Sequence, residues 1–142
     1  IGLADLHASS ICIEAWQSYE RLGSPEGDLS LARAVCYLAL APKSNAVYTA
    51  FSDALQLAKE TGSISPPKHI LNAPTQLMKN NGYGDGYIYD HDSENAFSGQ
   101  NFFPDELSRQ IFYSPVERGF ERELKKRLAY FEKLRSKRDK NM

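Results

Sequence analysis

Apolar residues recur every three to four positions through the first sixty residues, which is the spacing of one face of an α-helix. The pattern predicts three helices, over residues 5–22, 29–41 and 44–61. Gly23 and Gly62 follow the first and third helices as ending residues, and Pro42 ends the second because proline has no amide hydrogen to donate. Ser44 is placed to cap the third helix. Residues 1–62 are therefore predicted to form a helical unit.

The periodicity weakens over residues 63–116, which contain five of the seven prolines. One short helix is predicted there, over residues 74–81, with Pro74 in its first turn. An irregular stretch of this length is usually functional or ordered by its neighbours. Its many phenylalanine and tyrosine rings need to be buried, so we expect this segment to be folded.

Strong periodicity returns in the last part of the chain, where apolar residues from Val116 to Leu134 step by four or three. This predicts a basic amphipathic helix over residues 117–138. Taken together, the elements predict an all-α fold: a helical bundle with a long irregular, aromatic-rich segment. At 142 residues, the whole chain is the size of a single domain, 1–142.

The composition bounds the class of protein. The longest apolar run, residues 34–41, is far shorter than the ~20 residues needed to cross a membrane. Cys12 and Cys36 stand outside any CxxC pattern, so the sequence predicts a reduced, cytoplasmic protein without a zinc site. The chain begins with Ile1 instead of methionine, from which we expect a piece of a longer protein.

Candidate chemistry concentrates in residues 72–92, NAPTQLMKNNGYGDGYIYDHD. No GxxxxGK[ST] motif is present to cradle phosphates. Asp90, His91 and Asp92 are adjacent in sequence, and neighbours in an extended chain point to opposite sides, so they do not converge readily on a metal. A small hydrolase centred on these three residues is one hypothesis. A structural role, with glycines that permit positive φ, is the other.

Charge is distributed unevenly along the chain. Residues 1–117 hold 7 Lys and Arg against 14 Asp and Glu, whereas residues 118–142 hold 10 against 4. Basic side chains on the final helix can neutralise phosphates. This predicts, as an alternative function, a DNA-binding module; the candidate contacts are Lys125, Lys126, Arg127 and Lys133. A solvated helix that packs on a partner accounts for the same charges.

Four separated motifs occur in the order that characterises one family. They are APKSNAVY (41–48), HILNAPTQLMKNNGYGDGYIYDHD (69–92), QNFFP (100–104) and FYSPVERGFE (112–121). With IGLAD (1–5) at the start, nearly the whole chain resembles the C-terminal domain of the replication-associated recombination protein A family. These bacterial AAA+ ATPases are related to the yeast maintenance-of-genome-stability ATPase and the human Werner helicase-interacting protein.

The resemblance implies a helical domain, similar to the collar of clamp-loader subunits, through which four subunits assemble. ATP and Mg would then bind an upstream module absent from this chain, which itself would carry no cofactor and no catalysis. The intact protein would be a DNA-stimulated ATPase in replication-fork maintenance, recombination and repair. It would associate with single-stranded-DNA-binding protein and with the nucleoid. Leu71, Gln76 and residues 93–95 depart from the family pattern.

Aromatic residues are enriched at subunit interfaces, because they contribute large contact areas. On this ground we predict that aromatic side chains of the irregular segment form the oligomer interface. The predicted interface residues are Tyr83, Tyr87, Tyr89, Phe97, Phe102 and Phe103.

Overall fold

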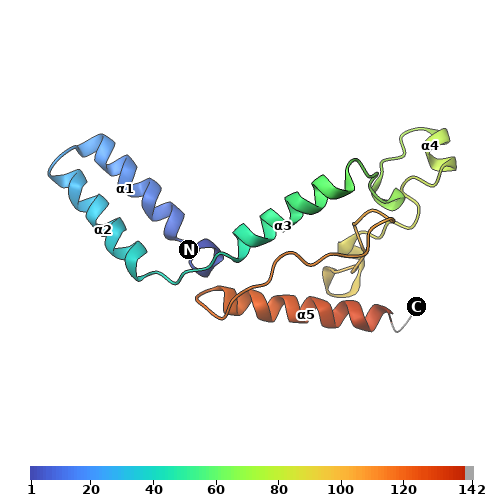
Figure 1. Cartoon of the computed structure of the whole chain (residues 1–142). Coiled ribbons are helices and arrows are strands. Elements are labelled where there is room, and N and C mark those ends of the chain that lie inside the picture. Colours follow the sequence, from blue (N-terminus) through green and yellow to red (C-terminus); the bar gives the residue numbers. More distant parts are fainter. Residues whose placement is uncertain (140–142) are drawn as a thin grey trace. The chain divides into compact units, whose positions relative to one another are not determined.

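The computed structural model describes residues 1–139, and all regular elements in that range are helical. This confirms the all-α prediction. Residues 1–139 form five α-helices and four short 3-10 helices, and Figure 1 shows their arrangement along the chain. The elements are η1 (Gly2–Ala4), α1 (Ala8–Leu22), α2 (Glu26–Leu40), α3 (Ala46–Thr61), η2 (Lys68–Ile70), α4 (Gln76–Asn80), η3 (Asp90–Asp92), η4 (Glu94–Ala96) and α5 (Glu121–Asp139).

The chain divides into two compact units, each built from segments distant in sequence. Unit 1 comprises residues 1–52 and 113–126, and unit 2 comprises residues 53–112 together with the chain from Arg127 onward. Helices α3 and α5 each contribute residues to both units. That the entire chain, 1–142, acts as one oligomerisation domain stays a prediction, and its last three residues lie outside the described range.

Helices α1 and α2 lie side by side in unit 1 (Figure 1). Gly27 allows them to approach closely, since a Cβ at this position would lie 2.7 Å from the Cα of Tyr19. Gly23 ends α1 with a φ of 64° and donates its amide hydrogen to the Tyr19 carbonyl. The Lys43 side chain donates to the carbonyls of Leu38 and Ala41 at the end of α2, each at 2.5 Å. A cation at the C-terminal end of a helix also interacts favourably with the partial negative charge that the helix dipole places there.

In unit 1, the start of the chain is hydrogen-bonded to the residue that precedes α5. The Phe120 amide donates to the Ala4 carbonyl at 2.8 Å, and Gly119 beside it has a φ of 51°. Glu121, the first residue of α5, is completely buried, and its Oε2 accepts the Val116 amide hydrogen at 2.7 Å. These contacts explain why the final helix begins at residue 121 and not at the predicted 117. The backbone just before it pairs with the first segment of the chain.

Unit 2 is mostly irregular, as predicted, and holds one complete α-helix. This helix, α4, is shorter than the predicted 74–81, and Thr75 caps it by accepting the Met78 amide hydrogen, so Pro74 lies before the helix. Side-chain hydrogen bonds replace regular pairing elsewhere. Gln100 accepts from the Ile88 amide at 3.0 Å and donates to the Gly86 carbonyl at 2.9 Å. Such bonds satisfy backbone groups that no helix or sheet pairs.

Candidate functional site

The segment of residues 72–92 has, at three positions, a backbone conformation that residues other than glycine adopt only with strain. Its three glycines, at positions 82, 84 and 86, have φ angles between 77° and 80°. Gly84 also donates its amide hydrogen to the Lys68 carbonyl at 2.9 Å, which joins the segment to η2. The prediction that these glycines allow the backbone to adopt a positive φ is confirmed.

The segment Asp90–Asp92 forms a 3-10 turn. Asp90 Oδ1 accepts the Ser98 amide hydrogen at 2.8 Å, and hydrogen bonds from Ser98 lower the pKa of Asp90. The His91 ring lies 5.0 Å from the Tyr89 ring. Within residues 1–139, no group of three or more His, Cys, Asp or Glu side chains gathers to hold a metal ion. The hydrogen bond that Asp90 accepts from the Ser98 amide is that of a residue that orders the backbone.

The six predicted interface aromatics do not form one cluster. Tyr87, Tyr89 and Phe102 are exposed, whereas Tyr83, Phe97 and Phe103 are half-buried within their own unit. The Phe97 ring packs 4.9 Å from Phe131 of α5. Phe102 stacks on His69 at 5.9 Å, and Phe103 lies 6.1 Å from Phe112. Whether any of these residues contacts another subunit stays a prediction.

Three of these rings, Phe97, Phe102 and Phe103, line one open cavity of about 290 Å³. Arg109 and Arg135 line the same cavity, together with the chain from Ser98 to Asn101. The rings were singled out in the sequence as candidates for a protein contact. The arginines were not, because Arg109 precedes Arg135 by 26 residues and no local pattern links them.

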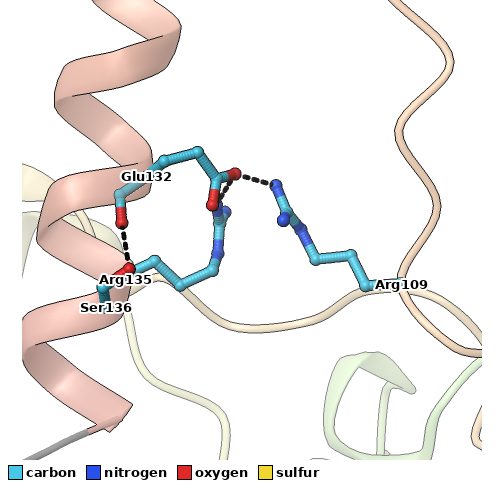
Figure 2. Close-up of polar contacts among 4 residues, drawn as sticks. All are labelled: Arg109, Glu132, Arg135 and Ser136. Carbon is cyan, nitrogen blue, oxygen red and sulfur yellow. Dashed lines mark hydrogen bonds and ion pairs between the residues drawn. The ribbon is translucent and has the colours of Figure 1, made fainter.

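A carboxylate holds the two arginines in place (Figure 2). One oxygen of Glu132 accepts from Arg109 at 2.6 Å and from Arg135 at 2.8 Å. The hydrogen bond from Arg109 is the largest cause that lowers the pKa of Glu132. Only the Glu132 and Arg135 pair, three residues apart on one helix, carries a signal readable in sequence.

The four predicted DNA contacts have different surroundings. Lys125 pairs with Glu117, and Lys126 pairs with Glu123 at 2.8 Å. Lys133 is exposed. Exposed ion pairs of this kind are typical of a solvated helix surface and contribute little to stability. DNA binding by this helix stays a prediction.

A second surface, missed in the sequence, lies on helix α2. Gly27 and Ala34, seven residues apart, are buried on one side of the helix. Leu29 and Leu40 lie on the opposite side, with 72% and 88% of their surface exposed. A helix that is apolar on opposite faces is normally covered on both. The alanine-rich and leucine-rich sequence of α2 carried this signal.

No large apolar side chain reaches full burial among residues 1–139. Apart from Pro67 of unit 2, the buried apolar side chains are six alanines of unit 1: Ala4, Ala8, Ala15, Ala34, Ala41 and Ala46. Meanwhile Trp16, Val35 and Tyr48 are more than half exposed. Larger exposed apolar surfaces mark contact sites, because burial of apolar area is the main favourable term in association.

Unit 1 also contains a tyrosine whose ionisation opposes folding. Burial is the largest cause that raises the pKa of the Tyr113 phenol, and the Glu121 carboxylate adds to the effect. The folded state therefore keeps this proton more tightly than the unfolded chain does. The resulting stabilisation is fully present below the unfolded pKa of about 10 and is lost as pH rises through the folded pKa.

We expect Tyr113→Phe to flatten the alkaline loss of stability. Between about pH 9 and 11.5, the urea unfolding midpoint of the protein with Tyr113 should fall more steeply than that of the variant, because phenylalanine cannot ionise. Tyr37 also has a raised pKa, through its 2.7 Å hydrogen bond to Asp5, but it is present in both proteins. Parallel curves for the two proteins would contradict this assignment.

Comparison with known proteins identifies the family to which the chain belongs. A family model described as MgsA AAA+ ATPase C terminal matches residues 1–132. Replication-associated recombination protein A of Coxiella burnetii is 46% identical over 135 residues, which are 94% of this chain and 31% of that protein. The protein of the same name from Escherichia coli K12 is 46% identical over 131 residues, 92% of this chain and 29% of that protein.

A eukaryotic relative is more distant. The protein named ATPase WRNIP1 in Dictyostelium discoideum is 32% identical over 118 residues, covering 80% of this chain and 13% of that protein. The chain thus spans less than a third of the length of these curated relatives. The resemblance inferred from the four sequence motifs is confirmed. The chain belongs to the family of MgsA AAA+ ATPase C-terminal regions.

Proposed function

We propose that this chain is the tetramerisation domain at the C terminus of a DNA-dependent AAA+ ATPase that acts in replication-fork maintenance, recombination and repair. The relatives named replication-associated recombination protein A support the process. The observation that carries the assembly role is the uncovered apolar side of α2, with Leu29 and Leu40 exposed opposite the buried Ala34.

An alanine core supports the same conclusion. A small unit is stable when it buries large side chains, each contributing about 1.5–3 kcal/mol. Unit 1 instead exposes Trp16, Val35 and the α2 leucines. A second copy that presents the same helices would cover these side chains reciprocally, as in a two-fold symmetric interface. Pairing of such pairs builds a tetramer.

The aromatic segment offers a second contact surface for the same assembly. Tyr87 and Tyr89 are each about half exposed, at 52% and 53%. Tyrosine is enriched at interfaces because its ring buries area and its hydroxyl still finds a hydrogen-bond partner. A tetramer needs two kinds of interface if it forms as a pair of dimers, so both surfaces have a place in it.

The intact protein would divide its tasks between modules. ATP and Mg bind and react in an upstream module, and this chain holds the subunits together. DNA and single-stranded-DNA-binding protein are partners of the whole assembly in the cytoplasm, near the nucleoid. For the part of the chain described here, no helix has the length and apolarity required to cross a membrane.

Sedimentation equilibrium of the purified chain tests the assembly role. At tens of micromolar, we expect a species of four times the 16.0 kDa chain mass. Dilution should dissociate it with a measurable dimer intermediate, because two interface types differ in strength. A single 16.0 kDa species across the concentration range would refute the proposal.

A further inference from the structure

The outer side of α2 carries a row of side chains whose spacing is the same in both directions along the helix. The row consists of Leu29, Arg33, Cys36 and Leu40, at intervals of four, three and four residues. Such intervals place side chains on one face of an α-helix. All four residues are exposed, and the leucines at the two ends expose 72% and 88% of their surface. A row with this symmetry is complementary to a second copy of itself that runs in the opposite direction.

Side-chain charge has opposite sign at the two ends of α2. Glu26 and Asp28 lie in the first turn of the helix. The Lys43 ammonium lies at the other end, where it donates to the Leu38 and Ala41 carbonyls. Antiparallel packing of two α2 helices therefore brings unlike charges together at both ends. It also sets the two helix dipoles in opposite directions, which is favourable.

From this pattern we propose that two copies of the chain pair through α2 in antiparallel orientation, about a two-fold axis at the level of the peptide bond between Ala34 and Val35. The inference rests on the proposed assembly role and specifies the α2 interface. The axis lies midway between Leu29 and Leu40, so each Leu29 packs against Leu40 of the partner subunit. Two such leucine pairs form about one axis, and they cover the exposed apolar side chains at both ends of the row.

The same axis assigns a neighbour to the other positions. Arg33 lies across from Cys36 of the partner subunit. Glu26 faces Lys43 of the partner subunit, because each of these two residues lies three positions beyond a leucine of the row. The short side chain of Cys36 leaves room for the stem of Arg33, whose guanidinium reaches solvent at the edge of the contact.

Parallel packing fits the same helix less well. In a parallel pair, equivalent residues face each other, so the two acidic first turns would lie together, as would the two Lys43 ammonium groups. The helix dipoles would also point the same way. An unrelated partner would place no symmetry on the row, whereas a two-fold contact requires that residue i meets j and j meets i. The spacing therefore favours a second copy over another protein.

Cross-linking of the native cysteines in the 142-residue chain tests whether α2 packs on α2. In the proposed pair, the two Cys36 residues are offset by three positions, about 4.5 Å along the helix axes. Packed helices lie ~8–10 Å apart, so a short bismaleimide can join the two thiols. We expect a covalent dimer on a denaturing gel from the unchanged protein and from Cys12→Ser, and its loss in Cys36→Ser. A dimer that depends on Cys12 and not on Cys36 would refute the α2 pairing.

Leucine-to-cysteine variants, in a background of Cys12→Ser and Cys36→Ser, test the direction of the two helices. Antiparallel packing separates the two copies of position 29 by eleven residues, about 16 Å along the helix axes. Leu29→Cys alone and Leu40→Cys alone should therefore give no covalent dimer, whereas a chain with both changes should give one. A covalent dimer from either single variant would show parallel packing and contradict the proposal.

Charge variants at the same two positions give a second measure of direction. In the antiparallel pair, Leu29→Glu/Leu40→Lys sets unlike charges opposite each other, whereas Leu29→Glu/Leu40→Glu sets like charges opposite each other. Both variants lose the leucine contacts, so both weaken the pair. The dissociation constant of the second should be about tenfold higher than that of the first, because two pairs change from attraction to repulsion. Equal dissociation constants would count against antiparallel packing.

Sedimentation equilibrium of the same samples separates this inference from the assembly role on which it rests. A tetramer that gives no covalent dimer through Cys36 would overturn the α2 pairing and leave the assembly role intact. A single species of 16.0 kDa would overturn both. A tetramer that cross-links through Cys36, and through positions 29 and 40 only in combination, is the result expected.

Discussion

Replacement of Gly119 by alanine should destabilise unit 1 by about 2–4 kcal/mol. Two costs add at this position. Gly119 has a φ of 51°, where a side chain strains the backbone, and a Cβ would also overlap the Ala4 carbonyl and lie 2.7 Å from Pro42 Cγ. The carbonyl cannot move away freely, because it accepts the Phe120 amide hydrogen. The melting temperature should fall by roughly 6–15 °C.

Gly86→Ala is the matched control for this substitution. Gly86 has a φ of 78°, but no atom lies within 4 Å of the position of its added Cβ. Only the backbone cost, about 1 kcal/mol, applies there. Both variants should be melted at the same protein concentration, since oligomerisation links stability to concentration. Equal losses for the two variants would show that Gly119 makes no close contact with the first segment of the chain.

The double variant Leu29→Glu/Leu40→Lys should dissociate the oligomer, with a rise of roughly 100-fold or more in the dissociation constant. Each substitution exchanges an exposed leucine that we place in the interface for a charge that would have to be desolvated there. The net charge of the chain does not change. Because both side chains lie on the outer side of α2, the circular dichroism spectrum of the folded chain should be preserved.

Tyr87→Ser/Tyr89→Ser is the comparison that separates the two candidate interfaces. If α2 and the aromatic segment form different interfaces, the α2 variant and the tyrosine variant should each stop at a dimer, and their combination should give monomers. Sedimentation equilibrium measures all three. A tetramer in the α2 variant, together with a monomer in the tyrosine variant, would place the whole interface in the aromatic segment and contradict the role of Leu29 and Leu40.

Local patterns determined the helices and the family. Apolar spacing located α1, α2 and α3 to within a few residues, because the side of a helix that packs repeats every three to four positions. Gly23 and Gly62 marked helix ends, and both adopt a φ of 64°. The four motifs identified the family before any coordinates were considered, since their residues and order are properties of the chain itself.

Only the tertiary structure decided which distant residues meet. The sequence grouped six aromatics by type, but the fold separates them: Phe97, Phe102 and Phe103 join Arg109 and Arg135 at one cavity, and Tyr87 and Tyr89 do not line it. The start of α5 likewise depended on Ala4, more than a hundred residues away. Most of these residues lie on irregular backbone that is held in place by long-range hydrogen bonds, such as those of Gln100. Irregular backbone has no repeating period, so its contact partners cannot be inferred from the sequence.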